Sequence, residues 1–165
     1  LDAAARGATG ERLRAVCRSL LLETERPQER GEPLELAELV NLVERVLGSE
    51  IWARARRADR VLTEVPFAFH APPGRLADPS EDAPADAPRL LEGVVDLAFL
   101  EAGGWVLVDY KTDVGTDAGF EARRRRYRRQ VDLYADVWPE LTGGAVKERA
   151  LFYTARDPRT ALETW

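Results

Sequence analysis

Residues 91–111 read LEGVVDLAFLEAGGWVLVDYK and are the most informative stretch of the chain. Two apolar runs, 91–100 and 105–111, lie on either side of a Glu-Ala-Gly-Gly segment, a pattern that is typical of a β-hairpin. Charged side chains interrupt both runs. We therefore expect a β-hairpin, and Asp96, Asp109 and Lys111 are the first candidates for function.

These three charged residues are expected on one face of the hairpin. Side chains alternate between the two faces of a strand, so Asp109 and Lys111 point the same way and Tyr110 points to the other side. On the preceding strand the same rule predicts two sets, which are Asp96, Ala98 and Leu100 on one face and Val95, Leu97 and Phe99 on the other.

Two registers of the hairpin are open. With a four-residue loop, Leu100 pairs with Trp105 and Asp96 lies opposite Asp109. With a Gly-Gly loop, Asp96 lies opposite Lys111 and forms a salt bridge. In the first register the two carboxylates repel each other and cost stability unless a cation lies between them.

The acidic pair suits a divalent metal. Asp has poor strand propensity, so two Asp residues on one face of an apolar hairpin favour a functional role. Carboxylate oxygens are suitable ligands for Mg²⁺ or Mn²⁺, and a nearby ammonium polarises a water or a phosphate oxygen. Lysine is also scarce, since Lys111 and Lys147 are the only lysines among 24 Lys and Arg residues. The trio indicates phosphodiester hydrolysis, and the alternative is a solvated polar face.

The rest of the chain predicts a mixed α/β domain over residues 1–165. Helices are expected from Glu11 to a stop near Pro27 and over 34–47, 50–58 and 120–138, and further strands over 61–69 and 145–154. Pro66 indicates an edge strand or a bulge. Residues 71–90 are rich in Pro, Asp and Ala and are expected to form a flexible loop. The order gives a central sheet with flanking helices and an N-terminal helical segment.

Composition limits the class of protein. A chain of 165 residues with 45% hydrophobic and 32% charged residues can bury a core, so wholly disordered chains are excluded. No apolar run is long enough to cross a bilayer and no secretory signal is visible, which favours a cytoplasmic protein without a membrane partner. The chain starts at Leu1 and contains no Met, so we expect a piece of a larger protein.

Cysteine and histidine counts restrict the kind of metal site. Cys17 is the only cysteine, which excludes an iron–sulfur cluster or a Cys-ligated zinc site built from this chain. His70 is the only histidine, so a multi-histidine site is excluded as well. The net charge of −5 argues weakly against nonspecific binding of polyanions, although arginines cluster at 54–60 and 123–129.

Three segments carry a resemblance to a known family. They are Gly93-Val-Val-Asp96, Val108-Asp-Tyr-Lys-Thr112 and Tyr127-x-x-Gln130-x-x-x-Tyr134-Ala135. In this order they resemble the C-terminal nuclease domain of RecB/AddA-type helicase–nucleases, which belongs to the PD-(D/E)XK nuclease superfamily. The resemblance covers about residues 7–154 and implies a restriction-endonuclease-like mixed sheet flanked by helices.

The resemblance implies a catalytic set made of Asp96, Asp109, Lys111, Gln130 and Tyr134. Asp96 and Asp109 would bind Mg²⁺ or Mn²⁺, with the carbonyl of Tyr110 adding a third oxygen. Lys111 would position or activate the attacking water. Gln130 and Tyr134 would face the site or the DNA backbone, and the alternative for Tyr134 is packing in the core.

One position departs from the family. Relatives commonly place a metal-ligating His four residues after a Gly on the first helix, whereas here Gly7 is followed by Glu11. Glu11 is expected to be a further metal ligand, or else the change marks a weakened or lost nuclease. Glu64, in a segment that is similar to the family's first core strand, supports the site or is a surface residue. His70 does not replace the missing His.

The implied function is a Mg²⁺- or Mn²⁺-dependent DNA nuclease domain within an ATP-dependent helicase–nuclease that processes double-strand breaks. Arg123, Arg126 and Gln130 are expected to contact DNA, and salt bridges to the helicase are the competing role of these arginines. The expected partners are DNA, the helicase domains of the parent chain and a partner subunit. The alternatives are an inactive module that guides DNA or braces the helicase, and a protein-interaction domain.

Overall fold

A five-stranded mixed sheet is the centre of the computed structural model, which describes residues 3, 7–22, 28–29, 31–73, 75 and 89–165. The helices are α2 (Gly10–Leu22), α3 (Leu36–Leu47), α4 (Glu50–Ala55) and α5 (Phe120–Thr142). The strands of the sheet are β3 (Arg60–Ala71), β4 (Arg89–Glu101), β5 (Gly104–Lys111), β6 (Val146–Tyr153) and β7 (Leu162–Thr164). β1 (Gln28–Glu29) and β2 (Glu32–Pro33) form a separate small pair.

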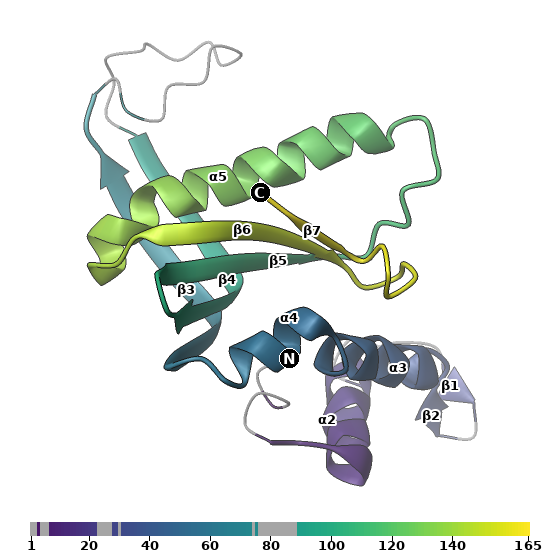
Figure 1. Cartoon of the computed structure of the whole chain (residues 1–165). Coiled ribbons are helices and arrows are strands. Elements are labelled where there is room, and N and C mark those ends of the chain that lie inside the picture. Colours follow the sequence, from purple (N-terminus) through teal and green to yellow (C-terminus); the bar gives the residue numbers. More distant parts are fainter. Residues whose placement is uncertain (1–2, 4–6, 23–27, 30, 74, 76–88) are drawn as a thin grey trace.

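The sheet has the order β3-β4-β5-β6-β7, and its neighbours are antiparallel except for the parallel pair β5 and β6. Helix α5 connects β5 to β6 and crosses one face of the sheet, while α3 and α4 lie on the other side (Figure 1). This arrangement confirms the predicted α/β fold, a restriction-endonuclease-like mixed sheet flanked by helices. None of the described helices combines the length and the apolar character that a membrane crossing needs.

Both faces of the central strands are covered, which explains their nearly continuous apolar sequence. On the α5 side, Leu107 and Leu151 pack against Val131, Ala135 and Trp138. The residues of the opposite cluster are Leu97, Phe99, Val106, Val108 and Phe152 from the sheet and Ile51, Trp52 and Ala55 from α4. A third cluster joins α2 to α3 through Leu13, Cys17, Leu21 and Leu36.

The hairpin takes the first of the two expected registers. Leu100 pairs with Trp105, as in the four-residue alternative, but Glu101 and Gly104 also pair and the turn is shorter than expected. Gly103 has a φ of 93°, a conformation that L-residues with side chains rarely adopt, so a glycine here permits the tight turn.

The predicted face of Val95 is wrong. Val95 packs on the α5 side together with Ala98 and Leu100, whereas Leu97 and Phe99 pack on the other side. The spacing from Val95 to Ala98 is odd, so the strict alternation of a strand is interrupted between them. β3 and β4 keep the same register on both sides of this point, and Asp96 is not part of the ladder with β3, so the change of phase lies at Asp96.

The neighbouring strand β3 has a matching irregularity. Thr63 pairs with Leu97 and Val65 pairs with Val95, but Glu64, which lies between them, is not part of the ladder. Glu64 has a φ of 53° and is the single non-glycine residue with positive φ in the described part of the chain. The two irregularities lie opposite each other, and Asp96 stands at this point of β4.

Several boundaries differ from the sequence-based expectations. Helix α5 continues through Pro139 and ends at Gly143, whose φ is 77° and whose N–H bonds to the Pro139 carbonyl. β3 and β4 extend into the expected loop at 71–90, since Ala71 and the segment from Arg89 are strand; residues 74 and 76–88 lie outside the described residues. Pro66 does lie on an edge strand, as predicted.

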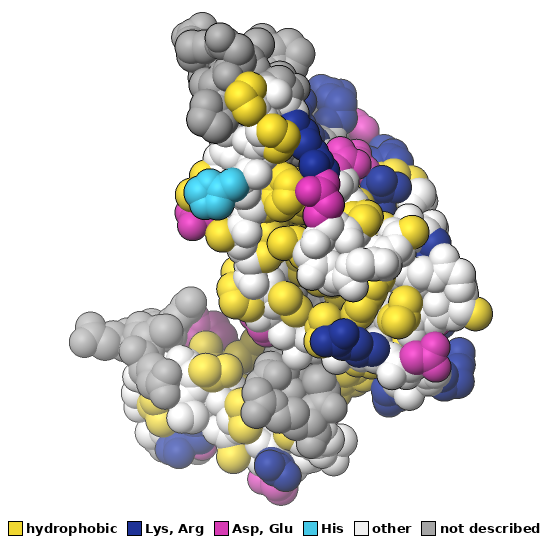
Figure 2. All heavy atoms as spheres, turned by 90° about the vertical axis from the view of Figure 1, so that its left-hand side faces the viewer, with side chains coloured by type: hydrophobic (Ala, Val, Ile, Leu, Met, Phe, Trp, Pro, Cys, Tyr) yellow, Lys and Arg dark blue, Asp and Glu magenta, His cyan; other side chains and the backbone are white. Residues whose placement is uncertain are grey.

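The shortest strands were not predicted, because β1, β2 and β7 are only two or three residues long and carry no recognisable pattern. α4 ends at Ala55, earlier than expected. The first helix is described as far as Leu22, and its expected stop near Pro27 lies outside the described residues. Figure 2 faces the left-hand side of Figure 1 and shows His70, the single histidine, at the surface close to apolar side chains. The large apolar residues that are exposed on β3 and β4 are Val61, Leu90 and Val94.

We expect Glu64→Gly to stabilise the domain by roughly 0.5–1 kcal/mol, because glycine adopts a positive φ without the steric cost that a side chain carries there. Urea denaturation at neutral pH measures the free energy of unfolding. Ala68→Gly, on the same strand but without a positive φ, is the matched control and should lower stability by about 0.5–1 kcal/mol. Equal losses in both variants would contradict this account of Glu64.

Candidate functional site

The candidate site lies where β4 and β5 separate. The last residues that pair in this part of the hairpin are Leu97 and Val108. Beyond them, the Tyr110 N–H donates to Asp96 Oδ2 at 2.7 Å, so the Asp96 carboxylate stands between the two strands. The interruption of β4 at Asp96 thereby places an acidic side chain next to the C-terminal end of β5.

Asp109 and Lys111 complete the polar group on β5. Asp109 is only 5% exposed, and its Oδ2 lies 2.6 Å from Lys111 Nζ. This short contact is an ion pair, and the Lys111 ammonium group partly offsets the cost of burying the Asp109 charge. Tyr110 points to the opposite face, as predicted, and packs edge-on against Phe152.

Helix α5 approaches the lysine from above the sheet. Lys111 Nζ donates to Gln130 Oε1 at 3.2 Å, and Gln130 Nε2 donates to the Tyr134 hydroxyl at 2.8 Å. Tyr134 is buried and meets the Phe67 ring edge-on, with centroids 5.0 Å apart. Lys111, Gln130 and Tyr134 are therefore brought together, and Tyr134 also packs in the core, which is the role named as its alternative.

A glycine makes room for this arrangement. A Cβ atom on Gly93 would lie 2.6 Å from the Tyr134 hydroxyl and 2.8 Å from Cζ of the same ring. The Tyr134 ring can therefore rest directly on the β4 backbone, three residues before Asp96. The spacing of Gly93 and Asp96 in the sequence thus has a steric reason.

Burial dominates the electrostatics of the two acids. Burial raises the pKa of Asp96, the Tyr110 N–H partly offsets this, and the charge of Asp109 raises the pKa further. Burial also raises the pKa of Asp109, against the opposing effect of Lys111. Two acids whose charged forms are both disfavoured lie beside a single ammonium group, so the site favours an additional positive charge.

The structure does not bring Glu11 to this pair. Glu11 is exposed on α2, and the described residues contain no group of three His, Cys, Asp or Glu side chains that could hold a metal together. Glu64 and His70 are exposed on β3. The expected ligand Glu11 is therefore outside the site as the structure places it, because the helical segment that carries it packs on α3.

Arg123 is held by carboxylates on the loop after β5. Its Nε lies 2.6 Å from Asp113 Oδ2, and its Nη2 lies 2.5 Å from Asp117 Oδ2. Arg126, by contrast, is exposed and makes no ion pair within the described part of the chain. Of the two arginines expected to contact DNA, Arg123 is thus engaged in an internal network.

Two further residues near Lys111, Asp113 and Tyr127, were not predicted as site residues. The Lys111 Nζ lies 4.7 Å from the centroid of the Tyr127 ring, and the Tyr127 hydroxyl donates to Asp113 Oδ2 at 3.4 Å. The signal for Tyr127 was present, because it lies one helical turn before Gln130 in the motif on α5.

Comparisons with known proteins identify the family of the chain. The family model of the PD-(D/E)XK nuclease superfamily matches residues 2–163. The chain belongs to this superfamily.

Its curated relatives include large proteins that are named as subunits of an ATP-dependent helicase/nuclease. The one from Bacillus velezensis is 32% identical over 133 residues, which is 76% of this chain and 10% of the relative. The Carboxydothermus hydrogenoformans protein is 32% identical over 86% of this chain and 12% of its own length, and the Acetivibrio thermocellus protein is 38% identical over 67% and 9%. The chain thus spans about a tenth of the length of these relatives.

The acids of this PD-(D/E)XK domain fit a divalent cation. Nucleases of the superfamily generally use divalent metal ions, and burial raises the pKa of Asp109 in spite of its ion pair with Lys111. Asp96 adds a second carboxylate whose pKa is raised by the charge of the first. Hard oxygen ligands of this kind are suitable for Mg²⁺ or Mn²⁺.

We expect Gly93→Ala to destabilise the domain by about 1–3 kcal/mol, because the new methyl group overlaps the Tyr134 ring and forces it to move. Urea denaturation measures the loss. In a Tyr134→Leu background the same substitution should cost clearly less, which a double-mutant cycle detects. Equal costs in the two backgrounds would show that Tyr134 is not what the methyl group meets.

We expect Asp96→Asn to stabilise the metal-free domain at pH 7. A carboxyl whose pKa is raised by folding costs stability once it ionises; the cost is absent below the unfolded pKa and complete above the folded pKa. Asn keeps an acceptor for the Tyr110 N–H without the charge. Stability curves between pH 4 and pH 8 should therefore show an advantage for the variant that shrinks toward pH 4.

In the same assay, added Mg²⁺ should reverse the order of stability of the wild type and the Asp96→Asn variant. At a concentration tenfold above its Kd the metal should stabilise the wild type by about 1.4 kcal/mol and the variant by less. A variant that is less stable than the wild type at pH 7 without metal would contradict the proposed cost of ionising Asp96.

Proposed function

We propose that this chain is a Mg²⁺- or Mn²⁺-dependent DNA nuclease domain of an ATP-dependent helicase–nuclease that processes double-strand breaks. The observation that carries the proposal is the convergence of Asp96, Asp109 and Lys111 at the point where β4 and β5 separate. Membership of a nuclease superfamily and relatives that are named helicase/nuclease subunits support it. The helicase domains would belong to the rest of a longer polypeptide. A partner subunit would complete the complex.

The residues of the site divide the work of hydrolysis. Asp96 and Asp109 would hold the metal, with the Tyr110 carbonyl as a further oxygen ligand. When bound, the metal supplies a water of lowered pKa and polarises the scissile phosphate. Lys111 orients the attacking water and stabilises negative charge that develops on the phosphate. Gln130 holds the lysine in place through its side-chain oxygen.

A groove beside the site is suited to the DNA backbone. It has a volume of about 650 Å³ and lies between β4 and α5. Its lining residues are Leu91, Glu92, Ala122, Arg125, Arg126, Arg129, Gln130, Leu133 and Tyr134. Gln130 lines the groove and also accepts a hydrogen bond from Lys111. A DNA strand that binds in the groove would therefore lead to the proposed metal site.

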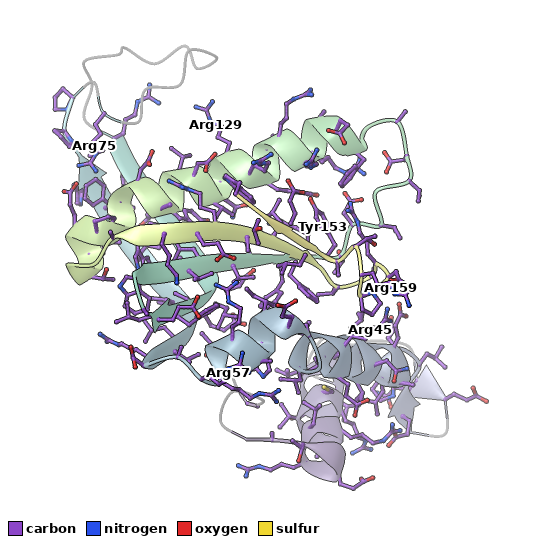
Figure 3. All side chains as sticks on the ribbon, in the orientation of Figure 1. Arg45, Arg57, Arg75, Arg129, Tyr153 and Arg159 are labelled. Carbon is purple, nitrogen blue, oxygen red and sulfur yellow. The ribbon has the colours of Figure 1, made fainter. Side chains whose placement is uncertain are left out.

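The arginines of α5 would have two different tasks. Arg124 and Arg128 contact Glu163, and Arg123 contacts Asp113 and Asp117, so these guanidinium groups stabilise the domain. Arg125, Arg126 and Arg129 line the groove, and Figure 3 shows Arg129 projecting from α5 away from the sheet. Phosphate contacts are proposed for the exposed Arg125 and Arg126 and for Gln130, because all three line the groove.

The test is cleavage of end-labelled DNA by the purified chain with Mg²⁺ or Mn²⁺. Asp109→Asn should lower the rate at least about a hundredfold, since even indirect partners of a metal commonly cost 10–100-fold. Asp59→Asn, an exposed Asp between α4 and β3, is the matched control and should cleave at the wild-type rate. Cleavage that persists in EDTA or in Asp109→Asn would overturn the proposed metal chemistry.

A binding module without catalysis is the second candidate. The observation that favours it is the position of Glu11, which leaves the acidic pair without a third carboxylate among the described residues. The same assay separates the two functions. Salt-dependent binding of DNA without cleavage, unchanged in Asp109→Asn, would support the module.

A further inference from the structure

Tyr127 contacts the lysine of the candidate site through its ring. The Lys111 Nζ lies 4.7 Å from the ring centroid, within the range of a cation–π interaction. The same ammonium group lies 2.6 Å from Asp109 Oδ2 and 3.2 Å from Gln130 Oε1. Three contacts thus surround a lysine side chain that is 18% exposed.

Two of these contacts come from one face of α5. Tyr127 and Gln130 are three residues apart in the helix, and side chains at this spacing are neighbours on its surface. Both act on the ammonium group from the helix side, whereas Asp109 acts from within β5. The aromatic face attracts the positive charge of the ammonium group from the helix side.

The Tyr127 hydroxyl is fixed as well. It donates to Asp113 Oδ2 at 3.4 Å, and the Asp113 carboxylate also accepts from Arg123 Nε at 2.6 Å. Arg123 holds the pKa of Asp113 below its usual range, so this acceptor stays ionised. The Tyr127 ring is therefore held at two points. The ring packs on the hydrophobic cluster between α5 and the sheet, and its hydroxyl bonds to Asp113 on the loop that follows β5.

We propose that Tyr127 is a positioning residue that holds the Lys111 ammonium group between Asp109 and α5. The ring face carries this effect, and the hydroxyl only orients the ring. The proposal rests on the nuclease function for its kinetic consequence, but the contact itself does not depend on activity. A purely structural Tyr127, packed in the core without an effect on Lys111, is the competing role.

The first test observes the lysine directly. The chain has only two lysines, so Lys147→Arg leaves Lys111 as the single lysine, and reductive methylation with ¹³C-formaldehyde labels it. We expect its methyl protons to shift upfield in this background and in Tyr127→Phe, since both keep a ring over the ammonium group. In Tyr127→Leu the upfield shift should disappear.

Controls separate this effect from general damage. The Trp165 ring makes a cation–π contact with Arg128 of α5. Trp165→Leu removes this other contact and should leave the Lys111 signal unchanged. In the Lys147→Arg protein we expect a nuclear Overhauser effect between the Lys111 methyl groups and the Tyr127 ring. This measurement tests the contact even if Tyr127→Leu fails to fold. Absence of that effect, or an unchanged shift in a folded Tyr127→Leu variant, would overturn the proposal.

The second test uses DNA cleavage with unmethylated protein. Tyr127→Leu should lower kcat roughly ten- to a hundredfold at nearly constant KM, as expected for a displaced catalytic group, whereas Tyr127→Phe should stay within about threefold of the wild type. Equal losses in the two variants would assign the effect to the hydroxyl and overturn the proposal. If the wild type cleaves no DNA, the nuclease function fails while the methyl signal still decides the role of Tyr127.

Discussion

The hydrogen bond from the Tyr110 N–H to the Asp96 carboxylate is the contact on which the candidate site depends. In a regular hairpin a backbone N–H of β5 would bond to a carbonyl of β4. Here a side chain takes that donor, the strands separate, and a half-buried acid comes to lie beside Asp109. Burial then disfavours both negative charges, and the charge of Asp109 further disfavours that of Asp96, so the fold carries a local cost that a cation would relieve.

Helix α5 connects this charged group to the hydrophobic core. Its apolar residues Val131, Ala135 and Trp138 pack on the sheet, while Gln130 reaches the lysine and Tyr134 rests on the Gly93 backbone. The position of the lysine is therefore set by the packing of a long helix rather than by a loop. Sites that are supported in this way keep their geometry more accurately than sites on mobile segments.

The sequence was sufficient to predict the hairpin and to place Asp96 and Asp109 on it, because apolar runs, a glycine turn and alternating side chains are local signals. It left the register open between two alternatives. The predicted face of Val95 was wrong, since the interruption of β4 at Asp96 lies opposite an irregularity at Glu64 on another strand. Long-range contacts explain the other failures. No local pattern reveals that Arg123 is neutralised by Asp113, or that Glu11 belongs to a separate cluster of helices.

The described components of the site come from one continuous part of the chain, from Gly93 on β4 to Tyr134 on α5. Strand β3 adds packing through Phe67, and the helices before it cover the opposite face of the sheet. A site encoded in so few consecutive residues can be joined to different neighbouring domains without being rebuilt.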